Sequence, residues 1–206
     1  MIGIIDYGLG NISAFLEAYK RMFIPACRVT NDQELGGVDR VVLPGVGSFD
    51  GAVERLRSAP YFKQLVERVT VERIPVLGVC VGFQMMMESS EEGSSEGLAW
   101  IPGEVRRLGS EESGLEVPLP HMGWNDVSVA APSPLHRGLD EPRFYFLHSY
   151  CVVPLEGDTV VATTAYGARF VSAAARGNVY GTQFHPEKSH HWGMGLLRNF
   201  AEVATC

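Results

Sequence analysis

The amino-acid sequence predicts one α/β domain over residues 1–206, with an open, mixed but mostly parallel β-sheet flanked by helices. In the first half, short apolar runs alternate with segments of helical periodicity, as in β-α-β units with parallel strands. In the second half most segments resemble strands, and several are separated by glycine-containing loops, which favours antiparallel additions. The length suits one domain, and no repeat or low-complexity linker divides the chain.

In the first half each expected strand is a short apolar run, and each expected helix has apolar residues three or four positions apart. Asn11 is suited to cap the first helix, and Pro25 ends it. The apolar face of that helix is expected to consist of Ile12, Phe15, Leu16, Tyr19 and Phe23. Strands are expected at residues 1–6, 27–30, 40–43 and 75–79, and helices at 52–57, 61–71 and from 83 to 88.

The second half consists mainly of short segments rich in Val, Phe, Tyr and Thr, which favour strands. Strands are expected at residues 105–108, 126–129, 144–146, 152–153, 160–164, 171–176 and 179–183, followed by a closing helix at 192–203. Two polar stretches, at 89–97 and 111–114, are expected to form long surface loops.

Composition and charge exclude several classes of protein. There are 17 Lys and Arg against 24 Asp and Glu, and no basic run, so nucleic-acid binding is not expected, because phosphate neutralisation needs clustered cations. The four cysteines lack CxxC spacing and are too sparse for a secreted disulfide scaffold. The N-terminus has no basic signal-peptide region, and the longest apolar stretch, 74–87, is too short to span a bilayer. We therefore expect a soluble cytoplasmic protein without membrane contact.

Cys80 is the first candidate for chemistry. It stands in Gly78-Val79-Cys80-Val81-Gly82, between an expected buried strand and an expected helix. Flanking glycines permit a tight strand-to-helix turn that lifts the side chain out of the sheet edge, as in hydrolase elbows. The N-terminus of the following helix should favour the thiolate. The alternative is a small buried cysteine at a strand end.

His185 and Glu187 form the second candidate site, in the segment TQFHPE after an expected strand. In extended backbone, residues two apart point the same way, so the carboxylate could orient the imidazole while the imidazole takes a thiol proton. A surface turn is the alternative for this segment alone. A cysteine elbow and a His-x-Glu strand end in one short chain favour the catalytic interpretation.

The segment PGVGSF after the strand at 40–43 is the third candidate. Strand ends of a parallel sheet form the ligand crevice, so this loop is expected to face Cys80. The Val81 amide would supply one oxyanion donor, and an amide of Gly45, Val46 or Gly47 the other. A phosphate loop is not supported, because the G-K-[ST] ending and the G-x-G-x-x-G spacing are both absent.

These groups together indicate acyl transfer through a thioester without identifying the acyl group. The segments GVCVGFQ, PGVGSF and GTQFHPEKS resemble those of the class I, triad-type glutamine amidotransferases. Within that family, HMGWN, FLHSY, GLAWIPGEVRRL and GLLRNF are similar to the glutaminase subunits of imidazole glycerol phosphate synthases. The resemblance covers nearly the whole chain. Val81, Phe83 and Ala99 depart from the residues common in that group, and none belongs to the triad.

The resemblance implies one flavodoxin-like glutamine amidotransferase domain that hydrolyses glutamine to glutamate and ammonia without a cofactor. It further implies a heterodimer with a separate cyclase subunit, a (β/α)₈ barrel. The cyclase would use the ammonia to make imidazole glycerol phosphate and aminoimidazole carboxamide ribotide in histidine biosynthesis. A partner also agrees with simple chemistry, because ammonia released into neutral water is mostly protonated and ammonium is not a nucleophile.

By position, the resemblance assigns glutamine binding to Gln84, Glu92, His148, Ser149 and Tyr150. It assigns the cyclase-facing surface to Asn11, Trp124, Asn125, Tyr145 and Lys188. Without it, Glu92 would be interpreted as a solvated loop acid, Gln84 as a polar residue at a cleft edge, and Trp124 as a core aromatic. A Gly-Trp-Asn turn that exposes the ring suits an interface better. No metal site is expected, because the remaining histidines lack an acidic partner at a telling spacing: His121, His136, His190 and His191.

Two further hypotheses remain open. The chain could feed ammonia to a different acceptor enzyme, although HMGWN and PGVGSF are similar to the form found in the histidine pathway. It could also be a non-catalytic regulatory subunit that keeps the fold, although the candidate triad is intact.

Overall fold

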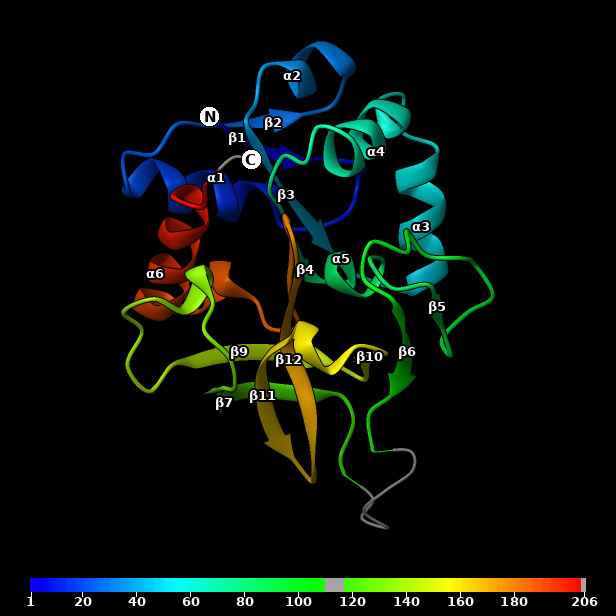
Figure 1. The fold of residues 1–206 in the computed structure, drawn as a ribbon, viewed down its shortest axis with the longest axis vertical. Helices are drawn as coiled ribbons and strands as arrows, with labels where there is room; N and C mark the ends of the chain where they lie inside the picture. Colours follow the sequence, from blue (N-terminus) through cyan, green and yellow to red (C-terminus); the bar gives the residue numbers. More distant parts are fainter. Residues whose placement is uncertain (110–116, 205–206) are drawn as a thin grey trace.

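The computed structural model describes residues 1–109 and 117–204 (Figure 1). Its strands are β1 Ile2–Ile5, β2 Ala26–Val29, β3 Arg40–Gly45, β4 Val76–Cys80, β5 Ser89–Ser90, β6 Gly103–Arg107, β7 His121–Asp126, β8 Ser128–Val129, β9 Arg143–His148, β10 Tyr150–Pro154, β11 Val160–Tyr166, β12 Ala168–Arg176 and β13 Val179–Thr182. Its α-helices are α1 Ile12–Arg21, α2 Asp32–Gly36, α3 Phe49–Arg57, α4 Phe62–Thr70, α5 Val81–Gln84 and α6 His190–Ala201, and its 3₁₀ turns are η1 Pro134–His136, η2 Gly157–Thr159 and η3 Pro186–Lys188. The loop expected at 111–114 and Cys206 lie outside the described residues.

Five parallel strands form one half of the large sheet, in the order β2-β1-β3-β4-β13. Numbered along the chain, this is the 2-1-3-4-5 order of flavodoxin-like folds. Figure 1 shows α1 and α6 on one side of these strands and α3 and α4 on the other. Helices on both faces explain why β1, β4 and β13 are buried along their whole length. The predicted α/β class is confirmed.

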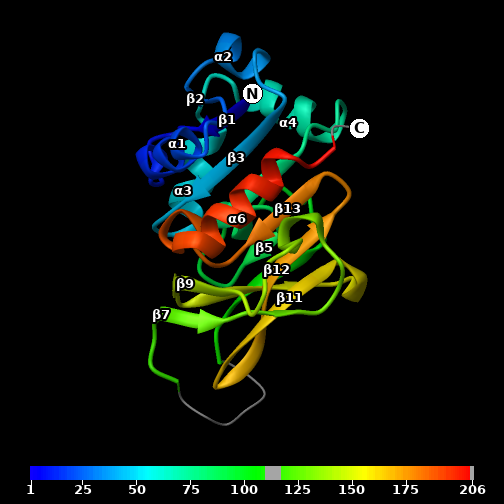
Figure 2. The same ribbon diagram turned by 90° about the vertical axis from the view of Figure 1, so that its left-hand side faces the viewer.

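The other half of the sheet is antiparallel, as expected from the strand-rich second half of the chain. β12 pairs with β13 and continues through β10 to β6, while β11 pairs with β12 and with β8. β5 adds to β6 in parallel. β7 and β9 form a separate antiparallel ladder, which Figure 2 shows below α6.

The carboxyl ends of β3, β4 and β13 lie at one edge of the sheet. Gly45 of β3 is in register with Cys80 of β4, and Val79 is in register with Thr182 of β13. The loops that follow these strands therefore face a common crevice, which is where ligands bind in open parallel sheets.

The helix expected from 83 to 88 is wrong in extent. α5 contains only Val81–Gln84, because the next carbonyls are taken by a distant segment. The main-chain N–H of Leu98 donates to the oxygen of Met85 (2.7 Å), and that of Trp100 donates to the oxygen of Met86 (2.9 Å). These bonds close the chain on itself and prevent further helical turns.

Two other local expectations were wrong. The expected Gly-Trp-Asn turn at 123–125 is not a turn, because these residues lie within β7, which is paired along its length with β9. Phe23 does not belong to the apolar face of α1: the helix ends at Arg21, Phe23 has a φ of 57° and is 95% exposed, and Met22 is buried instead. α2 was not expected, and the strand expected at 126–129 is the junction of β7 and β8. In the described parts of the chain, no helix has the length and apolar character needed to cross a bilayer.

Candidate active site

Cys80 is the last residue of β4 and stands directly before α5. Its φ is 55° and its ψ is −114°. A positive φ strains any residue other than glycine, and such strain at a turn from strand to helix is the mark of a nucleophile elbow. The side chain is buried, at 4% exposure. The elbow geometry expected from the sequence is therefore present.

Glycines allow this elbow to pack directly against the end of β3. A Cβ on Gly82 would lie 1.9 Å from the main-chain oxygen of Leu43, and one on Gly45 would lie 2.1 Å from the nitrogen of Gly82. No side chain tolerates such contacts. The sequence suggested that the glycines shape the turn itself. In the structure the positive φ falls on Cys80, and Gly82 serves close packing.

His185 follows β13, the parallel neighbour of β4. Its Nδ1 lies 2.9 Å from Oε1 of Glu187, and the two side chains are 5% and 2% exposed. His185 and Cys80 line the same cavity, and the sulfur of Cys80 lies 3.8 Å from the main-chain oxygen of Leu147 and 3.8 Å from Nε2 of Gln183. Because Nδ1 of His185 faces the carboxylate, Nε2 is the nitrogen left for the cavity. Burial lowers the pKa of His185, but the interactions with Cys80 and Glu187 outweigh burial and raise it to about 10.

His185 and Glu187 meet for a different reason from the one expected. Glu187 does not continue an extended strand, because it lies in the 3₁₀ turn η3, Pro186–Lys188. Ser189 Oγ donates to the oxygen of His185 (2.6 Å) and accepts from the N–H of Tyr145 (2.9 Å). The N–H of His185 in turn donates to the oxygen of Tyr145 (2.8 Å). β9 therefore holds the turn that brings the carboxylate to the imidazole.

A cavity of about 300 Å³ opens onto Cys80, a size suited to a small metabolite. Every residue assigned to glutamine binding from the sequence lines it: Gln84, Glu92, His148, Ser149 and Tyr150. Of the expected oxyanion residues, Val81, Val46 and Gly47 line it too, whereas Gly45 is buried in β3. His185 and Lys188 complete the polar part of the wall. The cavity thus brings together residues from six separate segments of the chain, because Pro120 also lines it.

Gln84 and Glu92 are held by contacts within the protein. Gln84 Nε2 donates to the oxygen of Tyr150 (2.9 Å). Glu92 Oε2 accepts from the N–H of Phe49 (2.8 Å), the first residue of α3, so this carboxylate is not simply a solvated loop acid. Both side chains are therefore fixed in position beside the cavity.

Gln183 is a buried polar residue to which the sequence gave no role. Its Oε1 accepts from Gln84 Nε2 (3.1 Å), and its Nε2 points to the sulfur of Cys80 (3.8 Å). It is completely buried. A glutamine at the end of a buried strand, two residues before the candidate histidine, was the available signal, because buried polar side chains need partners.

Most residues expected to face a partner gather round β7, β9 and η3. Trp124 stands opposite Tyr145 in the β7–β9 ladder, with ring centroids 6.3 Å apart. Lys188 Nζ lies 5.7 Å from the centroid of the Tyr145 ring, and Lys188 also lines the cavity. Asn11 caps α1 through its Oδ1, which accepts from the N–H of Ala14 (3.3 Å), and α1 packs beside η3.

Asn125 differs from these residues, because its amide is used inside the protein. Its Nδ2 donates to a main-chain oxygen at 2.9 Å and lies 3.2 Å from His121 Nε2. His121 and His136 are buried, and His190 and His191 are exposed, as packing or surface roles require. Among residues 1–109 and 117–204, no three His, Cys, Asp or Glu side chains gather as metal ligands would.

Comparisons with known proteins agree on one family. The family model described as glutamine amidotransferase class-I matches residues 4–203. The protein named imidazole glycerol phosphate synthase subunit HisH from Bdellovibrio bacteriovorus is 49% identical, covering 98% of this chain and 100% of its own length. The HisH of Leptospira borgpetersenii is 44% identical and the HisH 2 of Pseudomonas aeruginosa 43% identical, both with the same coverage.

Solved structures show the same fold at lower identity. A crystal structure described as a glutamine amidotransferase superposes with a TM-score of 0.73 at 22% identity, covering 98% of this chain and 97% of that one. A glutamine amidotransferase from Thermotoga maritima superposes with a TM-score of 0.61 at 21% identity, covering 90% and 75%.

Proposed function

The chain belongs to the class-I glutamine amidotransferases, in the branch of the imidazole glycerol phosphate synthase subunits, and on this premise we propose that Cys80, His185 and Glu187 hydrolyse glutamine to glutamate and ammonia. The observation that carries the proposal is the buried contact between His185 and Glu187, with His185 and the elbow residue Cys80 lining one cavity of metabolite size. This arrangement has the roles of a nucleophile, a general base and an orienting carboxylate.

The first half of the reaction forms a thioester. Because its pKa is raised to about 10, His185 already holds the proton of the Cys80 thiol at neutral pH, and the sulfur of Cys80 attacks the amide carbon of glutamine. The charge that develops on the amide oxygen is stabilised by the N–H of Val81 and an N–H of the Gly45–Gly47 loop. When the intermediate collapses, the C–N bond breaks, His185 returns its proton to the leaving nitrogen, and ammonia departs.

The second half hydrolyses the thioester. His185 takes a proton from a water molecule, whose oxygen attacks the thioester carbon. The C–S bond then breaks, His185 returns the proton to the sulfur, and glutamate leaves. Glu187 acts through His185 in both halves, because it holds Nδ1 and leaves Nε2 to exchange protons with the sulfur, the leaving nitrogen and water.

In this proposal, five residues that line the cavity form the binding site for glutamine: Gln84, Glu92, His148, Ser149 and Tyr150. The contact of Gln84 with Tyr150 and that of Glu92 with Phe49 keep these groups in place before glutamine arrives. Such preorganisation lowers the cost of binding and helps to align the amide carbon with the sulfur.

The acceptor of the ammonia is a cyclase subunit, which we infer to be a barrel protein bound as a heterodimer. Its docking surface is the face formed by Trp124, Tyr145 and Lys188, with Asn11 at its margin. An exposed aromatic beside a cation is typical of interface anchors. Because Lys188 lines the cavity and also contacts Tyr145, this face lies next to the place where ammonia is released. Residues 1–206 act as one domain, in a reducing cytoplasm that keeps Cys80 a free thiol.

Two rivals have less support. A non-catalytic subunit has no need of a buried contact between His185 and Glu187 beside a strained Cys80. A different ammonia acceptor does not agree with the shared names of the close relatives. The test is to measure glutamate release and imidazole glycerol phosphate formation with the chain and its cyclase together. Glutamate release without product formation would point to another acceptor, and no glutamate release would overturn the proposal.

A further inference from the structure

Behind the cavity wall, two buried histidines contact each other across the β7–β9 ladder. His121 and His148 stand opposite in register, and His121 Nδ1 lies 3.0 Å from His148 Nε2. The two residues are 3% and 6% exposed. His148 lines the cavity, whereas His121 does not. The proposed reaction assigns His148 to the substrate site and gives His121 no role.

The hydrogen bonds of the pair have one possible direction. His148 Nδ1 lies 2.9 Å from the main-chain oxygen of Tyr150, which only accepts, so Nδ1 must carry the proton. Burial lowers the pKa of His148 to about 3, which keeps the ring neutral and leaves Nε2 as an acceptor. The proton between the two rings therefore belongs to His121 Nδ1.

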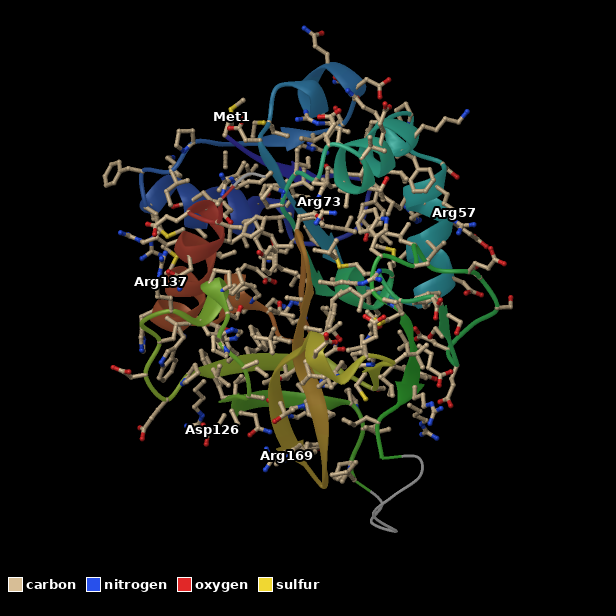
Figure 3. All side chains as sticks on the ribbon, in the orientation of Figure 1. Met1, Arg57, Arg73, Asp126, Arg137 and Arg169 are labelled. Carbon is tan, nitrogen blue, oxygen red and sulfur yellow. The ribbon has the colours of Figure 1, made fainter. Side chains whose placement is uncertain are left out.

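The same reasoning extends this series of hydrogen bonds to Asn125 of β7. Burial lowers the pKa of His121 to about 4, so this ring is also neutral and its Nε2 accepts. The donor is Nδ2 of Asn125, whose other N–H is fixed on the oxygen of Ala165. Asn125 precedes Asp126, whose side chain Figure 3 shows at the surface. The bonds thus run in one sense, from Asn125 through both histidines to Tyr150.

A second chain of bonds reaches the same carbonyl from the nucleophile. Gln84 Nε2 donates to the oxygen of Tyr150 (2.9 Å) and to Oε1 of Gln183 (3.1 Å), and Gln183 Nε2 points to Cys80 (3.8 Å). The oxygen of Tyr150 therefore receives one bond from the elbow side and one from the β7 side. Losing either would remove one of the two side-chain donors to this carbonyl, although the N–H of Leu108 still donates to the oxygen of Ser149 (2.9 Å).

We propose that His121 is a positioning residue: by donating to His148 it fixes the tautomer that holds the Tyr150 carbonyl, and so sets the cavity wall at residues 147–150 relative to Cys80. This inference rests on the proposed glutaminase function and adds a residue to its substrate site. Both ring nitrogens of His148 are engaged within the protein, so His148 contributes to glutamine binding through the wall it shapes and not through a free nitrogen.

Two substitutions at His121 separate the hydrogen bond from the packing of the ring. The ring is stacked between Phe146 and Tyr166, with centroids 4.7 and 4.1 Å away. His121→Phe keeps a ring there but removes the donor. His121→Asn loses the ring but keeps an N–H, because Nδ2 of Asn is attached to Cγ as Nδ1 of His is. If the hydrogen bond from His121 to His148 sets the cavity wall, His121→Phe should weaken glutamine binding more. If only the packing of the ring sets it, His121→Asn should weaken binding more.

The measurement is the KM and kcat for glutamine of the full chain assembled with its cyclase. We expect His121→Phe to raise KM by about 5- to 10-fold and to leave kcat within about twofold of the wild-type value, since the buried Nε2 of His148 loses its donor. His121→Asn should retain most of the wild-type affinity for glutamine. His136→Phe is the matched control, because His136 is also buried, neither ring nitrogen has a partner among the described residues, and it does not line this cavity. Its KM should stay at the wild-type value.

Nitrogen NMR of the wild-type chain tests the tautomer without any variant. We expect both rings neutral at pH 7 with the proton on Nδ1. A proton on Nε2 of His148, an unchanged KM in His121→Phe, or equal damage by Phe and Asn would each overturn the inference. These results are distinct from failure of the proposed function, which would appear as a wild-type chain that releases no glutamate.

Discussion

The carboxylate of Glu187 contacts the candidate triad through one atom. Its Oε1 lies 2.9 Å from Nδ1 of His185, and its buried Oε2 has no hydrogen-bond partner among the described residues. Glu187 therefore has no direct route to a substrate atom in this structure, and its influence passes through the imidazole. Substitution of His185 is therefore expected to reduce activity more than substitution of Glu187.

His185→Ala should reduce kcat/KM for glutamine more than Glu187→Gln. A positioned acid–base group contributes about 10²–10⁴-fold, and the alanine variant loses all of it. Glutamine at position 187 keeps an oxygen that accepts from Nδ1, so the tautomer survives while the charge is lost. Steady-state glutaminase assays of both variants, each assembled with the cyclase, make the comparison. Equal losses would mean that the carboxylate itself takes part in the chemistry.

Cys80→Ala should abolish glutamine hydrolysis and leave ammonia-dependent cyclase activity of the assembled complex intact. The positive φ of Cys80 marks it as the elbow residue, and of the described cysteines only Cys80 lines the cavity. Cys151→Ala is the matched control, because Cys151 is also buried but lies in β10. The assay follows product formation with glutamine and with ammonium salt. Full turnover of glutamine by Cys80→Ala would refute the assignment of the nucleophile.

Cys80 and His185 could be predicted as candidates from the sequence because each stands at or just after the end of a recognisable parallel strand, and parallel strand ends share an edge. Glu187 was predicted from its spacing to His185, although the 3₁₀ turn η3, and not an extended strand, brings it there. The contact between His121 and His148 could not be predicted, since it depends on the pairing of β7 with β9. Gly123 interrupts the apolar pattern of β7, so the segment was interpreted as a turn. The length of α5 was also out of reach, because bonds from Leu98 and Trp100 end it, and these residues are distant in the sequence.

Trp124→Ala should weaken binding to the cyclase by about 2 kcal/mol or more, as expected for an aromatic anchor at an interface. The ring is 37% exposed and is stacked on His190, with centroids 5.2 Å apart, so it is held in place before binding. Leu155→Ala is the control, since Leu155 is 72% exposed and lies just after β10. Titration calorimetry with the cyclase measures both. Should the leucine variant lose as much affinity, the docking face is misplaced.

Acid should destabilise the fold through three buried histidines. Burial lowers the pKa of His121 and His136 to about 4 and that of His148 to about 3, below the ordinary value of 6.5. The unfolded chain therefore binds more protons below pH 6.5, and the free energy of unfolding falls by about 1.4 kcal/mol per pH unit for each histidine.

His185 has the opposite sign. Its pKa is raised to about 10, so its contribution is complete below pH 6.5 and is lost as the pH rises toward 10. Urea unfolding from pH 5 to 9 should show both limbs. In His136→Phe, the slope of the free energy of unfolding against pH on the acid side should decrease by about 1.4 kcal/mol per pH unit, the contribution of one histidine, while the slope on the alkaline side stays the same. An acid limb of unchanged slope would show that His136 titrates normally.

Gly47→Val should lower the kcat of glutamine hydrolysis in the activated complex more than it raises KM. Gly47 lines the cavity with a φ of 87°, and a Cβ there would meet nothing within 4 Å. Valine therefore has space but strains the backbone, which disturbs the orientation of the loop amides. We expect glutaminase activity to be low in the free chain and kcat to rise when the cyclase and its nucleotide bind, because amide orientation acts on the transition state.

Gly138→Val is the matched control. Gly138 has a φ of 70°, a Cβ there would meet nothing within 4 Å, and the residue does not line the cavity, so this substitution should lower stability without changing kcat. Equal rates with and without the liganded cyclase, or an equal loss of kcat in both variants, would remove the loop from the mechanism.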